Sequence, residues 1–436
     1  MTIYNLISFL GILVLLAFAW LCSSNRRVVN WRAVAWGTAL SLAFALVIFV
    51  VPAGTKVFLV VNDVVVKVLD SATAGTQFVF GRLALSPGTT NAAGETSLGF
   101  FLAFQGLPTI IFFAALLGAL YYIGVMPFLV KLFARVFSRL MRISGAEALS
   151  VSSNIFVGVE SALVVKPHLK DMTRSELGTI ITAGMGTIAS TVLALYVLML
   201  KQYLPTIAGH LVSASFISAP ACIVMAKLVM PEVEKPATLG VDVKPYYERE
   251  DNFILSIING AMDGLKLLGG LITLLIAFVG LLALVNLILG WAGGLLNGWL
   301  GWNVEWSLQT FLGWVFYPFT LALGVPPADA AAVAKIVGER TVTTEVVAYG
   351  HLADLMATGG LKDPRSGLIA SYALCGFAHV ASLAVFIGGT GGLVPSRLRD
   401  LSRIGFRALL AATLACLMTG AIAGVFATGG SILLGK

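Results

Sequence analysis

Long apolar runs alternate with short polar connections along almost the whole chain. Eight of these runs reach about 20 residues, the length that an α-helix needs to cross the hydrocarbon core of a bilayer. The predicted spans are residues 3–22, 33–51, 103–126, 178–200, 207–230, 254–290, 368–393 and 408–428. The pattern predicts an all-α polytopic membrane protein with about eight transmembrane helices.

Three further segments are apolar but interrupted by polar residues or glycine. Residues 55–70 carry charges at positions 56, 63, 67 and 70, a spacing that places them on one helical face. We expect this segment to be an amphipathic helix that lies along the membrane surface. Residues 145–170 and 311–350 are predicted to form re-entrant hairpins, because a broken segment inside a membrane must be buried in protein or line a wet cavity.

The basic residues orient the predicted spans. Lys and Arg follow the first, third, fifth and seventh spans, whereas the opposite connections are nearly free of them. Because cytoplasmic loops are enriched in Lys and Arg, both chain termini are predicted on the outer side. The first hairpin then enters from inside and the second from outside, each followed by two spans. Such an inverted repeat is typical of secondary transporters that bind substrate near the middle of the membrane.

Composition narrows the class of protein further. Of the 436 residues, 58% are apolar and 11% are charged, against about 25% charged in an average soluble domain. The mean hydropathy of +0.95 excludes a soluble or disordered chain. The net charge of +7 follows from basic cytoplasmic loops and does not indicate a nucleic-acid partner. The four cysteines are widely spaced, and we expect core residues rather than disulfides or metal ligands.

Each predicted hairpin contains a glutamate in apolar surroundings, Glu160 and Glu345. An ionised acid at the centre of a membrane helix costs about 3 kcal/mol, so two such residues need a reason. They are predicted to accept hydrogen bonds from a polar substrate; the alternative is a polar pair that holds helices together. The adjacent pair Glu339 and Arg340 is interpreted as an internal ion pair or an interface anchor, with a role in substrate binding as the alternative.

Two spans contain small and polar residues, at 184–190 and 375–382. Unwound backbone there would expose carbonyl groups to a cation or substrate, although small residues also pack helices closely in membranes. Motifs for ATP binding, zinc-dependent hydrolysis and a nucleophilic serine are absent from the sequence, so neither an ATP-driven pump nor an enzyme is predicted. A passive channel would not need inverted hairpins.

Several motifs, in order along the chain, resemble the bacterial branch of the concentrative nucleoside transporter family. They are Leu107-Pro108-Thr109, Leu120-Tyr121-Tyr122, Asn154 to Gly158, Pro231 to Pro236, Glu345 to Tyr349, and Cys375-Gly376-Phe377-Ala378. The resemblance covers nearly the whole chain. It implies a homotrimer in the bacterial inner membrane that imports nucleosides together with sodium or a proton by an elevator movement.

The resemblance also implies a division of the chain and a set of site residues. Scaffold segments are expected at 1–142 and 231–310, and the two halves of a mobile transport domain at 143–230 and 311–436. The substrate site would contain Val159, Glu160 and Ser161 near the nucleobase, with Glu345 and Ser382 on the ribose and Phe377 and His379 in the pocket. Sodium would be held by Asn154, the Val157 carbonyl, Thr187 and the Ile188 carbonyl, all oxygen donors suited to a hard cation.

Two departures from the family pattern fall in this pocket. The first hairpin tip lacks the glutamine amide of the family motif, because Val159 follows Gly158 directly. His379 stands where the family has asparagine, and its imidazole can titrate near neutral pH. Sodium-coupled nucleoside import is therefore the leading hypothesis, with proton coupling or a modified nucleoside as alternatives.

Overall fold

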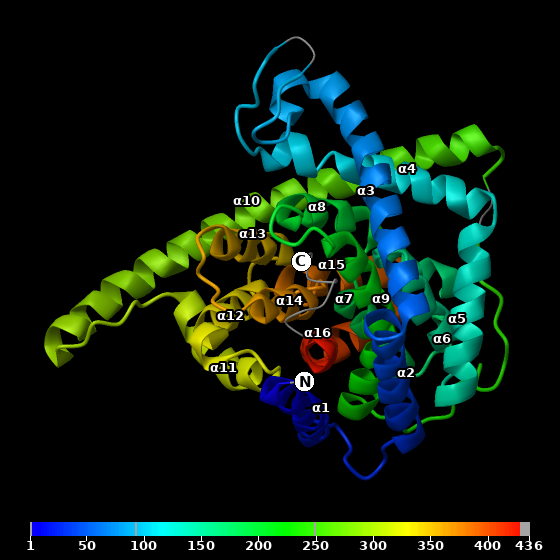
Figure 1. Ribbon diagram of the computed structural model, residues 1–436. Coiled ribbons are helices and arrows are strands. Elements are labelled where there is room, and N and C mark those ends of the chain that lie inside the picture. The colour runs from blue at the N-terminus through cyan, green and yellow to red at the C-terminus, as the bar shows by residue number, and fades with distance from the viewer. Residues whose placement is uncertain (1, 92–93, 248–249, 428–436) are drawn as a thin grey trace.

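The computed structural model describes residues 2–91, 94–247 and 250–427, and the side chains of residues 159 and 160 lie outside this description. Within the described ranges the regular structure is helical, with two isolated β-bridges and no β-sheet (Figure 1). The prediction of an all-α protein is confirmed.

The chain opens with three helices, α1 (Ile3–Leu21), α2 (Trp31–Phe49) and α3 (Pro52–Phe80). The first two coincide with the predicted spans. The third is longer than the predicted surface helix at 55–70, because Pro52 starts a helix well and the chain first leaves helical backbone at Gly81, where φ is +56°. All four of its charged residues are exposed, as the amphipathic pattern requires.

The chain then passes twice through the same order of elements. The first unit comprises a π-helical turn at Leu102–Gly106, α4 (Thr109–Tyr122), α5 (Val125–Met141), hairpin 1, a broken span and α9 (Ile207–Val229). Hairpin 1 consists of α6 (Gly145–Asn154) and a 3₁₀ helix (Val159–His168), and the broken span consists of α7 (Arg174–Gly186) and α8 (Ser190–Leu200).

The second unit follows the same plan. It comprises α10 (Phe253–Leu300), α11 (Leu308–Ala322), hairpin 2, a second broken span and, after a 3₁₀ turn at Pro395–Arg397, α16 (Leu398–Phe426). Hairpin 2 consists of α12 (Pro327–Arg340) and α13 (Glu345–Ala357), and the broken span consists of α14 (Pro364–Ala373) and α15 (Val380–Leu393). The hairpins and broken spans predicted from the sequence are thus present in both units.

The predicted limits of the second hairpin, 311–350, are wrong at both ends. The helix α11 is a separate element, because Gly324 adopts a left-handed φ of +82° that ends it, and Pro326 and Pro327 start the next helix. The second arm continues to Ala357. Apolar content alone did not separate α11 from the hairpin.

Among the described residues, seven helical segments are long and apolar enough to cross a membrane. They include α7 with α8 taken as one segment, and α10, which has 48 residues. The predicted span at 368–393 is not one continuous helix, because α14 and α15 are separated by the unwound residues 374–379. The interruption expected from the small residues near Gly376 is therefore present.

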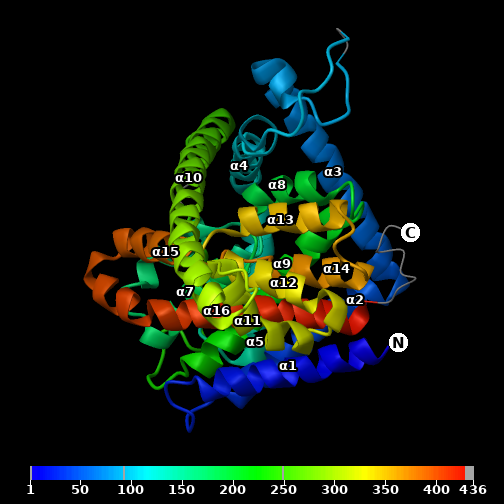
Figure 2. The same cartoon turned by 90° about the vertical axis from the view of Figure 1, so that its left-hand side faces the viewer.

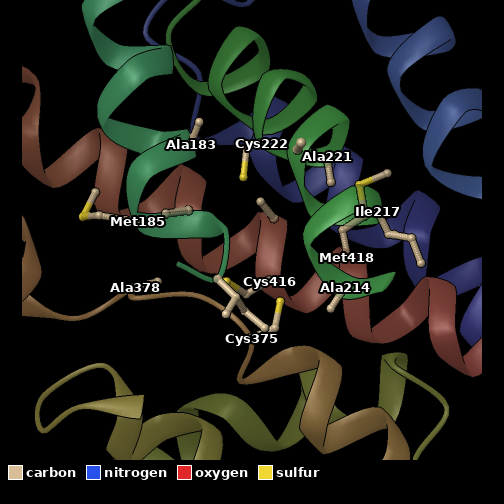
Figure 3. Packing of buried hydrophobic residues seen from close by; sticks show 14 of the residues in the cluster. Ala183, Met185, Ala214, Ile217, Ala221, Cys222, Cys375, Ala378, Cys416 and Met418 are labelled. Carbon is tan, nitrogen blue, oxygen red and sulfur yellow. The ribbon is translucent and has the colours of Figure 1, made fainter. Parts of the chain in front are cut away.

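The two broken spans cross each other backbone to backbone. A side-chain carbon added at Gly376 would lie only 2.6 Å from the Met185 carbonyl oxygen and 2.9 Å from the carbonyl carbon of Gly186. Because no larger residue fits between backbones this close, glycine at position 376 allows the crossing. Figure 3 shows the packed core around the crossing, where Cys222, Cys375 and Cys416 lie among alanine and methionine side chains. All four cysteines of the chain are free thiols, and these three are buried.

Contacts between loops identify two opposite faces of the molecule. On one face, the Ser24 N–H donates to the Val229 carbonyl at 2.9 Å, and the Arg397 side chain donates to the Met172 carbonyl at 2.6 Å. These segments belong to the basic connections that were predicted to share one side. The first and last helices meet elsewhere, where Asn5 Nδ2 donates to the Val425 carbonyl at 2.9 Å. Both ends of the described chain therefore lie together, away from the basic loops.

The helix α10 runs along the outside of the helical core (Figures 1 and 2). It packs extensively on α4 and makes few contacts with the hairpins and broken spans. Its C-terminal part projects away from the rest of the molecule (Figure 1). One face of this helix nevertheless forms a wall of the cavity described next.

Candidate functional site

A cavity of about 200 Å³ lies where the hairpin tips, the two broken spans and α10 meet. Four of the predicted site residues line it: Glu345, Phe377, His379 and Ser382. The other lining residues are Gly158, Ala189, Thr191, Val192, Thr344, Val385 and Phe386, together with Lys266, Leu267, Gly270, Leu271 and Leu274 from α10. The sequence-based grouping of hairpin 2 with the second break is consistent with this geometry.

Glu345 is the central polar residue of the cavity. It is the first residue of α13, where Thr344 caps the helix, and the N-terminal end of the helix dipole favours a negative charge. Only 1% of the residue is exposed in the protein. Its Oε1 accepts a hydrogen bond of 2.8 Å from the Tyr196 hydroxyl, and its Oε2 lies 2.9 Å from His379 Nε2.

One carboxylate oxygen of Glu345 retains capacity for a ligand. Among the described residues, Oε2 receives no well-aligned hydrogen bond, despite its closeness to the imidazole. A carboxylate has lone pairs for about four hydrogen bonds, and a buried one gains from each additional donor. Glu345 can therefore accept hydrogen bonds from hydroxyl groups of a bound molecule.

His379 is held in one orientation by the start of α15. It is the N-cap residue, and its Nδ1 accepts the backbone N–H of Ser382 at 3.2 Å. An accepting Nδ1 carries no proton, so the ring proton of the neutral imidazole is assigned to Nε2, on the side of Glu345. Ser382 in turn donates to the carbonyls of Phe377 and His379. These bonds organise the second break so that its polar side faces the cavity.

Tyr196 is a site residue that sequence reasoning missed. It lies on α8, is fully buried, and stacks on Tyr349 with ring centroids 4.4 Å apart. The hydroxyl of Tyr349 is used elsewhere, donating to the Ser371 carbonyl at 2.7 Å. A buried tyrosine needs a partner for its hydroxyl, and this need was the available signal. The identity of that partner depends on the packing of α8 against hairpin 2.

Lys266 was also missed. It lines the cavity from α10, and its side chain is 74% exposed and paired with Asp263 at 2.8 Å, one turn earlier. A charged residue in so apolar a helix most often faces an aqueous path or a ligand. Lys266 therefore adds a charged residue, already paired with Asp263, to the lining of the cavity that contains the Glu345 carboxylate.

The predicted nucleobase contacts are only partly described. Gly158 lines the cavity, whereas Ser161 is buried behind it and its carbonyl accepts a hydrogen bond from Ser150. Val159 and Glu160 were also predicted, and their side chains lie outside the described residues. Their role stays a prediction.

The predicted sodium ligands lie at the ends of α6 and α7. Asn154 is the last residue of α6 and fully buried; its Nδ2 donates to the Ser150 carbonyl at 3.1 Å, while its Oδ1 has no hydrogen-bond partner among the described residues. Thr187 follows the end of α7 and donates to the Ala183 carbonyl, which leaves its oxygen lone pairs available. Val157 and Ile188, whose carbonyls were predicted to bind sodium, are also buried. Each follows Asn154 or Thr187 closely in the sequence.

These residues fit a monovalent cation chemically. A buried amide oxygen without a donor is costly unless something binds it. The two helices that pack together here, α6 and α7, both end near these residues, and each helix C-terminus carries a partial negative charge. Neutral oxygen donors with two such termini favour a hard cation.

Of the roles predicted for Glu339 and Arg340, the internal ion pair is not formed. Glu339 instead lies 2.7 Å from His351 Nδ1, and Arg340 donates to the Ala373 carbonyl at 2.8 Å. Side chains of adjacent residues on a helix point in different directions, so Glu339 and Arg340 do not meet and each binds a different partner.

Comparison with known families agrees with this architecture. Models of the N-terminus and C-terminus of Na⁺ dependent nucleoside transporters match residues 10–83 and 210–424, and a nucleoside recognition model named Gate matches residues 103–203. The chain belongs to the Na⁺-dependent nucleoside transporter family. It is thus a membrane transporter and not an enzyme, and the resemblance to concentrative nucleoside transporters is confirmed.

Relatives of this transporter match over nearly its full length. An uncharacterized transporter of Haemophilus influenzae is 37% identical, covering 96% of this chain and 97% of the relative. The nucleoside permease NupC of Helicobacter pylori is 35% identical, covering 97% and 98%. The solved structure of CNTnw in an inward-facing substrate-bound state superposes with a TM-score of 0.85 at 34% identity, covering 97% of this chain and 98% of CNTnw.

Proposed function

We propose that this transporter imports nucleosides into the bacterial cytoplasm across the inner membrane, coupled to the entry of sodium. The observation that carries the proposal is the buried Glu345 carboxylate, which lines the central cavity with an oxygen available to accept hydrogen bonds. Nucleosides offer two neighbouring ribose hydroxyls, and a charged acceptor binds such donors more strongly than a neutral one does.

The cavity offers complementary positions for both parts of a nucleoside. Glu345 and the Ser382 hydroxyl oxygen would accept hydrogen bonds from the ribose, and His379 and Tyr196 hold the carboxylate in place. Phe377, Phe386 and the leucines of α10 give apolar walls for a flat base. A site built on hydroxyl recognition rejects analogues that lack the hydroxyls, since its buried polar groups then stay unpaired.

Sodium coupling draws support from the position of Asn154. Its amide oxygen and the ends of α6 and α7 form a site for one positive charge next to hairpin 1, whose tip also lines the substrate cavity. A bound cation would order the hairpin tip, and an ordered tip would favour substrate binding, so that each ligand raises the affinity for the other.

The proposed movement is that of an elevator. The hairpins and broken spans pack on one another, whereas α10 forms one wall of the cavity yet contacts them little. A site between a compact mobile unit (143–230 and 311–436) and a fixed helix could slide along that helix. The long exposed apolar surface of α10 suits a homotrimeric scaffold in lipid. Both termini would lie on the outer side, opposite the basic loops.

Proton coupling is the second candidate, and one observation favours it. His379 Nε2 and Glu345 Oε2 are 2.9 Å apart inside the substrate cavity, a geometry in which a proton could be carried with the substrate. The first hairpin tip lacks the glutamine amide of the family motif, so a modified nucleoside is an alternative substrate.

Uptake into proteoliposomes tests these candidates directly. Radiolabelled uridine and adenosine are offered under an inward sodium gradient or an inward proton gradient. Sodium-driven accumulation of either nucleoside supports the proposal, and proton-driven accumulation favours His379 and Glu345 as the coupling groups. Absence of uptake by folded protein under both gradients refutes ordinary nucleoside transport and directs the search to modified nucleosides.

A further inference from the structure

Arg340 is the most deeply buried cation in hairpin 2. It is the last residue of α12 and is 0% exposed. Among the described residues no carboxylate lies within ion-pair distance of it, and its Nε and Nη2 have no well-aligned hydrogen bond. The buried thiols of Cys416 and Cys375 lie beside the guanidinium. Burying a guanidinium without a carboxylate partner costs free energy in a membrane protein. Its surroundings must therefore supply negative potential in another form.

Besides the two thiols, helix ends supply that potential. Arg340 Nη1 donates at 2.8 Å to the carbonyl of Ala373, the last residue of α14. The guanidinium therefore lies at the C-terminus of α14. Arg340 is itself the C-terminal residue of α12, so two helix C-termini meet at this side chain. Each helix C-terminus is equivalent to about half a negative charge, so two of them balance about one positive charge.

The first unit of the repeat has the same arrangement without a built-in cation. There the first arm of the hairpin, α6, ends at Asn154, and the first half of the broken span, α7, ends at Gly186. In the second unit the corresponding elements, α12 and α14, end at Arg340 and Ala373. Asn154 offers a neutral oxygen where Arg340 offers a positive charge.

We propose that Arg340 is a resident cation that occupies, in the second unit, the place which sodium takes in the first. Two helix C-termini converge in each unit and need one positive charge. In the first unit that charge is exchangeable and is carried with the substrate; in the second it is covalently fixed. The transporter therefore couples one sodium ion to each nucleoside, and hairpin 2 needs no ion to stay ordered.

This inference rests on the proposed sodium coupling, and the first experiment separates the two. Purified transporter in proteoliposomes is assayed for uridine uptake and for charge moved per uridine at a clamped potential. We expect one charge per uridine and a sodium Hill coefficient of one. Sodium-stimulated uptake with two charges per uridine would overturn the inference alone. Uptake that sodium does not stimulate would instead refute the proposed coupling.

Variants then test the role of Arg340 itself. Arg340→Lys keeps a cation and is expected to retain sodium-driven uptake with one charge per uridine. Arg340→Met removes the charge, and we expect uptake at least tenfold lower, or sodium dependence that becomes cooperative with a Hill coefficient approaching two. Wild-type uptake and sodium dependence in Arg340→Met would overturn the proposal. If neither variant folds, the charge measured per uridine in the unmodified protein still decides.

Arg365 provides a matched control. It is also buried, and its guanidinium donates to the carbonyls of Gly324, Gly424 and Ala427, which follow or belong to the ends of α11 and α16. These helix ends lie away from the hairpin tips. Arg365→Met is expected to lower thermal stability without changing the sodium Hill coefficient or the charge per uridine. A changed number of charges per uridine in this variant would show that removing any buried arginine alters coupling, and it would overturn the specific role of Arg340.

Discussion

Replacing Glu345 by glutamine tests the substrate site with the smallest possible change of shape. In the unmodified protein, Tyr196 donates to one oxygen and His379 approaches the other. An amide has one accepting oxygen and one donating nitrogen, so Glu345→Gln places a donor opposite one of these two donors. It also removes the charge that strengthens a hydrogen bond from a ribose hydroxyl.

The expected loss can be estimated from that bond. A hydrogen bond to a charged group contributes about 1.5–3 kcal/mol, and each 1.4 kcal/mol corresponds to about tenfold in affinity. The glutamine oxygen still accepts a neutral hydrogen bond worth about 0.5–1.5 kcal/mol, so about 1–1.5 kcal/mol is lost. We therefore expect uridine to bind roughly 5- to 12-fold more weakly to Glu345→Gln. The advantage of uridine over 2′-deoxyuridine or 3′-deoxyuridine should shrink in the variant, because the acceptor that distinguishes them is weakened.

The assay is uridine binding by calorimetry to detergent-purified protein, with uptake KM as a second measure. Glu339→Gln is the matched control, since Glu339 is another buried acid of hairpin 2 that pairs with Gln309 and His351 and does not line the central cavity. An affinity of Glu345→Gln within twofold of the unmodified protein, or an equal loss in Glu339→Gln, would refute the assignment.

Three other substitutions address separate parts of the site. Asn154→Ala should abolish sodium stimulation of uptake while leaving the unfolding temperature nearly unchanged; an unaltered half-saturating sodium concentration would contradict the ion site. Tyr196→Phe keeps the stack on Tyr349 but loses the 2.8 Å hydrogen bond to Glu345, so the KM for uridine should rise several-fold. An unchanged KM would mean that this bond does not position the carboxylate. Lys266→Met should weaken uridine uptake more than cytidine uptake, because an ammonium donor favours a 4-oxo over a 4-amino base; equal effects in a competition assay would argue against contact with the base.

Some features of the site were predictable because they contradict the surrounding sequence. An acid or an imidazole within a long apolar run is costly, so Glu345 and His379 were conspicuous before any fold was known. The break between α14 and α15 was visible in the same way, as small and polar residues inside a span. Such signals depend only on neighbouring residues, so they can be read from the sequence alone.

Other features depend on which segments meet in space. The bond from Tyr196 to Glu345 joins residues 149 positions apart, and nothing in the sequence near Tyr196 indicates its partner. Lys266 became a site residue only because α10 passes the hairpin tips. The separation of α11 from hairpin 2 depended on a left-handed turn at Gly324, which an apolar run of similar composition conceals.

The sequence by itself therefore determined that this protein is a helical membrane transporter, with two hairpins and two polar breaks, because hydrophobic burial in a bilayer imposes a pattern on every span. Only the tertiary structure decided which charges are paired. Glu339 and Arg340 are adjacent in the chain, yet one faces His351 and the other the end of α14. Charge pairing follows the direction of side chains around a helix and the approach of distant helix ends, and both arise only when the chain is packed.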